Sequence, residues 1–508
     1  MTAVLRRQLQ GGAAGDAKVA GGHEIASNVA IQLVARTITM AISIVTVSLT
    51  ARTLHPTGYG VWTGITSFIG LFEVFTDLGF TTAAMQRMAA EPERESEWLG
   101  ALAGARTALS FAVIPICAIA VPIFLSANHH AHAVAFILMI TILTTGAATL
   151  MSVFQSRLRA GIVLALTVAQ SLIWLGAVVV LAVGNADVVQ FTIVYTVLVC
   201  LISAWQVQIT RRHAHIDWRA GRKLWRPLAR VAVPLGVSGL MVSVYWQIDS
   251  VLLLQIAGAK EAGFYGAAYG FLGPLTFLPA AVMGSFFPVL AAVYGRDPDR
   301  ARRLVQIAAE AMAIISVPVL AGAIALSVPI VHFLYGPGFH RSAGLLPILM
   351  IAFVSICFGS LSGFLAPVLD LQKRLAVYSA LGAVLNIGLN AALIPSYGAF
   401  GSAWATVATE ILTMTLMLAT SLHALRLRIR LGRILRTFAV AAAMTGVMEL
   451  LKPFGFILAG IVGLLFYAGA LFAVRVIDVD EVRALRASRR QGPVAGPPPM
   501  APEEALHR

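Results

Sequence analysis

Long apolar runs limit the possible folds of this chain more than any other feature. They recur from Ile25 to Arg475, and a helix needs about 20 such residues to cross a hydrocarbon core of about 30 Å. Only helices and closed barrels satisfy their own backbone hydrogen bonds in lipid. The sequence therefore predicts an all-α polytopic membrane protein with about fourteen transmembrane helices. The predicted spans are 25–50, 59–82, 99–124, 133–155, 161–183, 188–209, 231–256, 263–290, 304–334, 345–369, 376–394, 401–424, 438–452 and 454–475.

The composition agrees with a membrane protein. Charged residues make up only 12% of the chain, against about 25% in soluble domains. A net charge of +14 would suggest a nucleic acid partner in a soluble chain, but here the cations lie in loops. Of the 37 Lys and Arg residues, 31 fall in segments on the same side as the N-terminus. We therefore expect no nucleic acid partner, a multi-pass membrane location, and both termini in the cytoplasm.

Two similar turns predict two similar halves. Thr57-Gly58-Tyr59-Gly60 follows the first span, and Gly263-Phe264-Tyr265-Gly266 follows the seventh. An even number of spans separates these turns, so the halves share one topology, as in parallel repeats that work by alternating access. A hinge-like segment, 51–58, joins the first two spans. The predicted parts are a disordered leader (1–24), a first six-helix bundle (25–209), a basic linker (210–230), a second six-helix bundle (231–424), two additional helices (438–475) and a cytoplasmic tail (476–508).

The linker is the most basic segment, with seven Lys or Arg residues. Trp218, Leu224 and Trp225 make it amphipathic. We interpret it as an interfacial helix on anionic lipid headgroups. The alternative is a solvated loop.

Deep cations are the first candidates for function. A charge at membrane depth costs at least about 2.5 kcal/mol, so it usually faces a wet cavity or another charge. Arg36 and Arg106 are the deep basic residues, and the planar arginine fork binds phosphate oxygens in pairs. Two alternatives stay open: Arg36 pairs with Glu73 or Asp77 as a structural strut, or Arg106 extends to the cytoplasmic interface.

Carboxylates within the spans are candidates for a coupling-ion site or for charge pairs. Glu73 and Asp77 are four residues apart and share one helix face. They would together hold a proton or a sodium ion. The alternatives are that they neutralise Arg36, or that Asp77 caps the loop that follows.

The second half offers Asp249, Glu310 and Glu410. Glu410 is nearly central in its span, whereas Glu310 lies close enough to the cytoplasm to pair with Arg302 or Arg303. The spans of the second half contain no deep Lys or Arg that could pair with these acids. A phosphate site is therefore expected in the first half.

Other patterns argue against enzyme chemistry. No phosphate-cradling Gly-Lys-Ser/Thr loop and no nucleophile–base constellation occurs. We expect a transporter with no metal site, and with no cofactor besides coupling H⁺ or Na⁺. Tyr245, Trp246, Tyr265 and Tyr269 are interpreted as an interfacial aromatic belt, with stacking on sugars as the alternative.

Three motifs resemble those of polysaccharide-export flippases, which handle lipid-linked oligosaccharides and belong to the multidrug/oligosaccharidyl-lipid/polysaccharide exporter superfamily. The similarity extends from Ile25 to Ile429. The motifs are Asn28 followed by Arg36 and Ser43, the turn Thr57-Gly58-Tyr59-Gly60, and Asp77-Leu78-Gly79-Phe80 running to Gln86-Arg87.

This resemblance implies a V-shaped pair of six-helix bundles around a cationic lumen. Of the deep basic residues, Arg36 and Arg106 carry over as pyrophosphate-binding candidates, and Asn28 and Gln247 complete the predicted lumen residues. The implied substrate is an oligosaccharide on undecaprenyl pyrophosphate, moved from the cytoplasmic to the periplasmic leaflet. It would serve exopolysaccharide, capsule or O-antigen (lipopolysaccharide) synthesis. The implied partners are membrane lipids and polysaccharide polymerase and chain-length proteins.

Three alternatives remain. A cation-coupled multidrug exporter and a lipid II flippase belong to the same superfamily. A membrane-embedded polymerase or ligase would generally need large periplasmic loops, but the predicted outside loops are each about ten residues or shorter.

Overall fold

The computed structural model describes residues 22–125, 129–157 and 160–476, so the predicted tail and most of the predicted leader lie outside the described residues. The described residues form helices and no strand. The helices are α2 (Gly22–Asp77), α3 (Phe80–Ala90), η1 (Pro92–Arg94), α4 (Glu95–Phe124), α5 (His129–Leu138), α6 (Thr141–Ala148), η2 (Thr149–Met151), α7 (Ser152–Ser156), α8 (Ala160–Val183), α9 (Val188–His213), α10 (Trp218–Ile256), α11 (Ala259–Tyr269), α12 (Leu272–Leu275), α13 (Phe277–Val293), α14 (Pro298–Tyr335), η3 (Pro337–Phe339), α15 (His340–Val368), α16 (Gln372–Tyr397), α17 (Ala399–Ala424), α18 (Leu431–Leu451), η4 (Lys452–Phe454) and α19 (Phe456–Ala473).

The first two predicted spans form one bent helix, α2. The bend lies at His55, where the backbone takes φ 55° and ψ 172° inside otherwise helical residues. The prediction of a hinge over 51–58 was therefore too wide. Pro56 is tolerated because it starts the second helical segment, where the missing N–H would have no helical partner.

The number of spans agrees with the prediction of about fourteen. Thirteen helices in the described part are long and apolar enough to cross a membrane, and the first of them, Arg36–Ala90, contains the bend of α2. The predicted span 133–155 is not a single helix, because it divides into α5, α6, η2 and α7.

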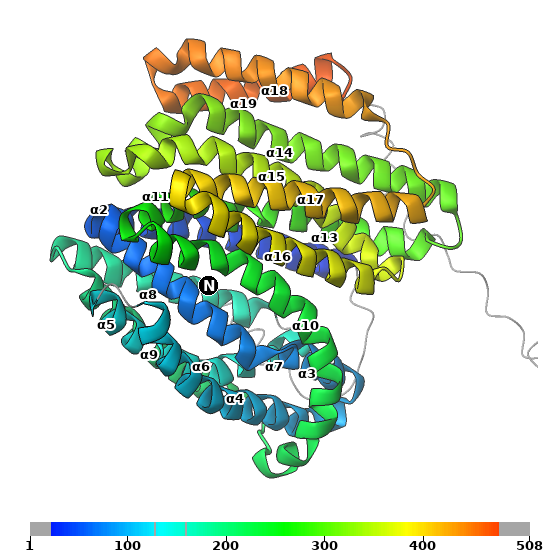
Figure 1. The fold of residues 1–508 in the computed structure, drawn as a ribbon. Helices are drawn as coiled ribbons and strands as arrows, with labels where there is room; N and C mark the ends of the chain where they lie inside the picture. Colours follow the sequence, from blue (N-terminus) through cyan, green and yellow to red (C-terminus); the bar gives the residue numbers. More distant parts are fainter. Residues whose placement is uncertain (1–21, 126–128, 158–159, 477–508) are drawn as a thin grey trace, which may run out of the picture.

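The helices form two groups that meet at one end and diverge towards the other (Figure 1). We call the end at which α2 bends the bend end, and the opposite end the basic end. Helices α3 to α9 form the first group, and α11 to α17 form the second. Helices α18 and α19 pack on the outside of α14.

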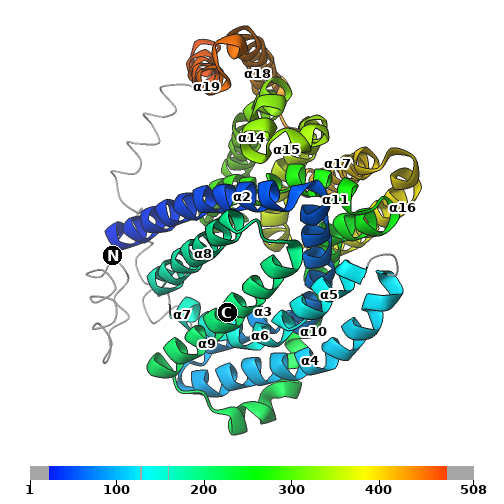
Figure 2. The ribbon, with the colours of Figure 1, turned by 90° about the vertical axis from the view of Figure 1, so that its left-hand side faces the viewer.

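Two helices contact both groups. The first segment of α2 lies between α8 and α14 (Figure 2), and Ser48 and Arg52 donate hydrogen bonds to the carbonyl oxygen of Leu334 in α14. Helix α10 begins against α4 and ends against α16 and α17. The first helix of each half therefore contacts the opposite half.

Close backbone contact joins the two halves at the bend end. A Cβ atom at Gly60 of α2 would lie 1.7 Å from the carbonyl oxygen of Ala259, and one at Gly263 of α11 would lie 1.8 Å from that of Pro56. Only glycine permits this approach, as at other helix contacts in membranes. The glycines of the two similar turns thus form the contact between the halves.

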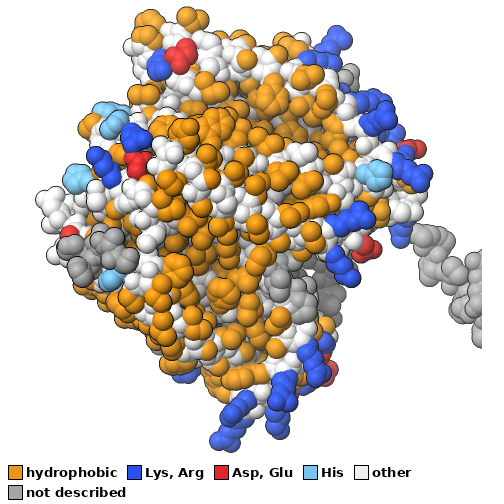
Figure 3. All heavy atoms as spheres, viewed as in Figure 1, with side chains coloured by type: hydrophobic (Ala, Val, Ile, Leu, Met, Phe, Trp, Pro, Cys, Tyr) orange, Lys and Arg blue, Asp and Glu red, His pale blue; other side chains and the backbone are white. Residues whose placement is uncertain are grey.

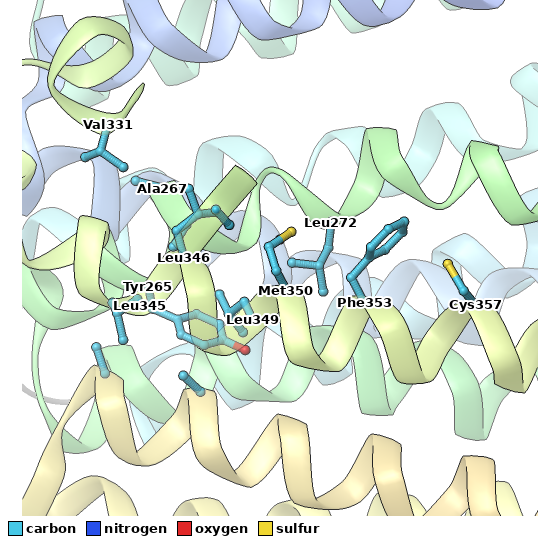
Figure 4. Packing of buried hydrophobic residues seen from close by; sticks show 14 of the residues in the cluster. Tyr265, Ala267, Leu272, Val331, Leu345, Leu346, Leu349, Met350, Phe353 and Cys357 are labelled. Carbon is cyan, nitrogen blue, oxygen red and sulfur yellow. The ribbon is translucent and has the colours of Figure 1, made fainter. Parts of the chain in front are cut away.

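The second group has the larger core. Figure 4 shows Tyr265, Leu349, Met350 and Phe353 packed between α11 and α15, and each is at most 1% exposed. Because these side chains fill the space between the helices, the second group packs as one body.

Charge and apolar surface separate along the helix axes. Figure 3 shows an apolar surface across the middle of the molecule, with most of the visible Lys and Arg side chains at the basic end. The basic linker joins this end as the start of α10. Leu224 and Trp225 are partly buried against the core of the first group, and the interfacial position of the linker on lipid headgroups stays a prediction. Trp218 is exposed, at 47%.

Candidate functional site

The first half holds a cluster of paired charges at the basic-end half of α2, which we call the first-half cluster (Glu73, Thr76, Asp77, Thr81 and Arg106). Arg106 of α4 forms an ion pair with Asp77, with 3.1 Å between Nη1 and Oδ1. Its Nη1 also donates to Thr81 Oγ1 at 3.1 Å, and its Nη2 to Thr76 Oγ1 at 3.3 Å. The Arg106 side chain is 12% exposed, so the alternative in which it extends to the interface was wrong.

The two carboxylates of this cluster have different partners. Asp77 accepts from Arg106 and from the backbone N–H of Thr81, at 3.3 Å. The expectation that Asp77 caps the next segment is therefore correct. Glu73 instead accepts from Thr141 Oγ1 of α6 at 2.9 Å. The two acids share a helix but not a hydrogen-bonding partner.

One polar atom of the cluster has no protein partner. The Nε atom of Arg106 is buried and makes no hydrogen bond in the described part of the chain. A buried donor without a partner is costly, so this atom is free to meet a ligand oxygen or water.

Arg36 lies apart from this cluster. Its guanidinium lies 5.6 Å from the ring centroid of Phe277 in α13, and the residue is exposed. No ion pair of Arg36 is found among the described residues, so the strut with Glu73 or Asp77 is not formed. Asn28 belongs to α2, but its side chain lies outside the described residues.

A cavity of about 610 Å³ lies between the two halves near the bend end. We call it the central cavity. Its aromatic walls are Trp62 of α2, Trp246 of α10 and Tyr269 of α11. Hydroxyl and amide groups complete the lining: Thr63, Thr66, Ser67, Ser243, Gln247 and Ser250. The predicted lumen residue Gln247 thus lines a cavity, and the volume is typical of ligand sites, which span about 300 to 1,000 Å³.

The central cavity and the first-half cluster share one side of α2. Asp77 follows Thr66 by eleven residues, which is about three helical turns, so both side chains leave α2 in the same direction. The rise of about 1.5 Å per residue places them about 16 Å apart along the helix.

The second half holds a cluster of buried acids, which we call the second-half network (Tyr245, Asp249, Tyr265, Asn390, Thr406 and Glu410). Asp249 is 2% exposed. It accepts from Tyr265 Oη at 2.8 Å, from Thr406 Oγ1 at 2.7 Å and from Asn390 Nδ2 at 2.8 Å. No cation pairs with it in the described residues. The carboxylate is therefore surrounded by neutral groups.

Glu410 is the second acid of this network. It accepts a hydrogen bond from Tyr245. Tyr245 and Asp249 are one turn apart on α10, and Thr406 and Glu410 are one turn apart on α17. Each helix thus offers one carboxylate and one hydroxyl to the other helix.

Glu410 also lines a cavity of about 250 Å³ inside the second group. Trp246 lines both this cavity and the central cavity. The indole therefore lies between the second-half network and the space where the halves meet.

Glu310 belongs to neither cluster. It pairs with Arg433 of α18 at 3.2 Å and accepts from Gln306 at 2.7 Å. The expected pairing with Arg302 or Arg303 was wrong, because Arg302 instead donates to Asp299 and to the backbone of Leu425.

The positions of two tyrosines contradict the predicted interfacial aromatic belt. Tyr265 is fully buried and bound to Asp249, and Tyr245 is bound to Glu410. These residues do not form an interfacial belt. Of the four aromatic residues in that interpretation, Trp246 and Tyr269 line the central cavity, where they could stack on a ligand.

Sequence reasoning missed Asn390 and its neighbour Asn386, which are both 0% exposed. They lie one turn apart in an otherwise apolar helix. Two carboxamides at that spacing on one face were the signal that could have identified this site.

Comparison with known proteins places the chain in a family. A model of the family described as "Polysaccharide biosynthesis protein" matches residues 25–293, more than half of the chain. The chain belongs to this family. The predicted resemblance to a polysaccharide-related family is therefore confirmed.

Individual relatives are more distant. The "Probable flippase AglR" of Haloferax volcanii is 27% identical over 176 residues, which are 34% of this chain and 36% of AglR. The aligned part thus spans only about a third of that relative.

Solved structures show the same fold. A structure of the lipid II flippase MurJ in an inward closed conformation has a TM-score of 0.71 at 15% identity, covering 87% of this chain and 98% of MurJ. The multidrug transporter DinF-BH has a TM-score of 0.59 at 14% identity, covering 80% and 98%. At these identities the likeness concerns the fold alone.

The region matched by the polysaccharide biosynthesis family model contains some candidate residues and not others. It includes the first-half cluster, the lining of the central cavity and Asp249. Asn390, Thr406 and Glu410 lie beyond residue 293. The family assignment therefore rests on the first half and the start of the second.

Proposed function

We propose that this protein is a flippase that moves an undecaprenyl-pyrophosphate-linked oligosaccharide from the cytoplasmic to the periplasmic leaflet by alternating access. The basic end would face the cytoplasm of a bacterial inner membrane. The unit would serve exopolysaccharide, capsule or O-antigen synthesis, with polymerase and chain-length proteins as later partners.

The observation that carries this proposal is the central cavity. Aromatic faces and hydroxyl groups are the two kinds of surface that sugars bind, and here both surround one space of about 610 Å³. The cavity lies where the halves meet, so a relative movement of the halves would change its access. Membership of a polysaccharide biosynthesis family and the named flippase relative support the same substrate class.

The pyrophosphate would bind on the first-half side, nearer the basic end. Arg106 has a buried Nε atom without a protein partner, and Arg36 has no ion pair in the described residues. Each offers N–H donors to phosphate oxygens. The distance of about 16 Å between the levels of Asp77 and Thr66 leaves room for sugars between the phosphates and the central cavity.

The second-half network would hold the coupling ion, a proton or Na⁺. A buried carboxylate without a cationic partner is unstable as a bare anion, so Asp249 favours binding either ion. Asn390 Oδ1 and Ser402 Oγ are buried without hydrogen-bonding partners in the described part. These atoms and Asp249 are the oxygen ligands that we propose for Na⁺.

Reconstitution tests the proposal. Purified protein in proteoliposomes should carry a fluorescent undecaprenyl-pyrophosphate oligosaccharide across the bilayer, as measured by its accessibility to a membrane-impermeant quencher. The Arg36→Ala variant should lose transport, and Arg36→Lys should retain part of it. Arg303→Lys, at an exposed residue of α14 outside both cavities, is the control for a conservative arginine change.

The same assay separates the alternatives. Transport of lipid II in preference to the oligosaccharide carrier would assign the protein to peptidoglycan synthesis. Ion-driven movement of a cationic dye, with no movement of either lipid, would favour a multidrug exporter. Normal arrival of lipid-linked units in the periplasm of depleted cells would contradict the flippase proposal.

A further inference from the structure

A second cavity lies at the bend end, outside the central cavity. Its volume is about 550 Å³. Arg52, His55 and Pro56 line it from the bend of α2, and the end of α14 and the turn into α15 line the other side. We call it the bend-end pocket; its remaining lining residues are His332, Phe333, Tyr335, Gly336, Pro337, Gly338 and Phe339.

The polar lining residues are donors. Arg52 uses Nε and Nη2 to donate to the carbonyl oxygens of Leu334 and Phe333. These bonds fix the guanidinium at the rim and leave the N–H groups of Nη1 for a ligand. His55 and His332 are exposed, and an imidazole offers at least one N–H in either protonation state.

No carboxylate competes for these donors among the described lining residues. Glu261, an acid at the same end, is bound to Arg341 and to the backbone N–H of Ala399. The pocket thus has an uncompensated positive character, which suits an anion.

The backbone at His55 gives independent support. Residues other than glycine rarely adopt a positive φ, and such conformations are retained mainly at functional sites. The bend with φ 55° lies in the lining of this pocket. Arg52 and His55, three residues apart on one face of the helix, both line it.

The opposite wall of the pocket is apolar. Tyr335 and Phe339 pack with their ring centroids 5.6 Å apart. Phe333 is 56% exposed, and Phe454 of η4 at the same end is 76% exposed. Exposed rings beside a cationic site match the boundary between lipid tails and headgroups.

We propose that the bend-end pocket binds the phosphate group of a membrane lipid. The donors of Arg52, His55 and His332 would contact the phosphate oxygens, and the exposed rings would contact the attached chain. Both halves of the protein contribute to the pocket, so binding would favour the state in which the bend end is closed. The inference does not depend on the proposed function, because a phospholipid and a lipid-linked sugar offer the same group.

Titration of the purified full-length protein in detergent with inorganic pyrophosphate, at constant ionic strength, tests this proposal. The double variant His55→Asn/His332→Gln should bind at least about tenfold more weakly at this pocket. Asparagine is chosen because it tolerates positive φ. His340→Gln, at an exposed histidine of the same end outside the pocket lining, is the matched control and should bind like the unmodified protein.

Two further variants keep the test decisive. His332→Gln alone changes only an exposed side chain, so weaker binding by this variant would support the pocket even if the double variant unfolds. Arg36→Ala should retain the binding that the double variant loses, which separates this pocket from the proposed transport path. The proposal is overturned if pyrophosphate does not bind saturably, or if the double variant binds as tightly as His340→Gln.

A comparison of nanodiscs made from two lipids tests whether a phospholipid supplies the phosphate. If phosphatidylglycerol nanodiscs weaken pyrophosphate binding relative to phosphatidylcholine nanodiscs, a phospholipid headgroup occupies the pocket. Equal binding in both would show that the phosphatidylglycerol headgroup does not compete for the pocket, and would overturn a phospholipid as its occupant.

Discussion

The two halves of this protein bury acidic residues in opposite electrostatic settings. In the first half, Asp77 forms an ion pair with Arg106, and Glu73 is bound by Thr141. In the second half, Asp249 receives only hydroxyl and carboxamide donors. A paired charge such as Asp77 can remain fixed, whereas a buried acid with neutral neighbours must take up a proton or a cation to be stable. The difference gives Asp77 a structural role and supports the proposed ion coupling at Asp249.

The largest expected effect is on stability in the first half. Arg106→Ala should lower the free energy of unfolding by about 3 kcal/mol, because it removes a largely buried guanidinium together with its bonds to Asp77, Thr81 and Thr76. Denaturant unfolding in detergent measures this. Adding Asp77→Asn should restore part of the loss, and Arg87→Ala, at a more exposed ion pair with Glu91, should have little effect. An Arg106→Ala protein as stable as the unmodified one would remove the contrast between the halves.

The next effect is on transport and concerns the second half. Asp249→Asn should slow transport in proteoliposomes by about a hundredfold, or about 2.7 kcal/mol, without lowering stability, because no buried ion pair is broken. Glu73→Gln is the matched change in the first half and should stay within about threefold. Equal losses in both variants would show that the halves do not differ in this way.

The aromatic residue between the second-half network and the central cavity should affect substrate binding. Trp246→Ala should raise the KM for the lipid-linked oligosaccharide by about tenfold, since it removes one stacking face from the central cavity. Trp205→Ala, at an exposed residue of α9, should leave KM unchanged. If both variants behave alike, sugars do not contact the Trp246 indole.

The smallest effect is expected at Glu310. Glu310→Gln should cost no more than about 1 kcal/mol of stability and should not change transport, because the pair with Arg433 is partly exposed. The same unfolding and transport measurements apply. A loss of transport as large as that of Asp249→Asn would add a second essential acid to the second half.

Much of the fold was predictable because a membrane imposes simple rules on a chain. Span length, the concentration of cations at one end and the repeated glycine turns all follow from residue order. The hinge was predicted too wide, because helical hydrogen bonds continue on both sides of His55 and only one residue leaves the helix. The predicted span 133–155 agrees with one candidate membrane span, Ala131–Phe154, but its division into α5, α6, η2 and α7 was not predictable, since hydropathy does not distinguish a continuous helix from short helices in series.

The charged residues of the candidate site were predictable from the sequence, but their interaction partners were not. The sequence identified Arg106, Asp77, Asp249 and Glu410 as charges within apolar spans. The structure buries Asp249 and Glu410, nearly buries Arg106 and leaves Asp77 half-buried. The sequence also correctly indicated that the second half lacks a deep cation. Asn390 was missed because an uncharged amide costs less in a span than a charge and so gives a weaker signal.

The amino-acid sequence alone determined that this chain crosses a membrane many times, which end is basic, and which side chains need a polar environment. These properties depend on local composition and on helical periodicity. The tertiary structure decided which charges neutralise each other, since Arg106 and Asp77 come from different helices and Asp249 meets Thr406 across 157 residues of sequence. Such partners are selected by helix packing, because only close approach of separate helices makes one arrangement of buried charges more stable than another.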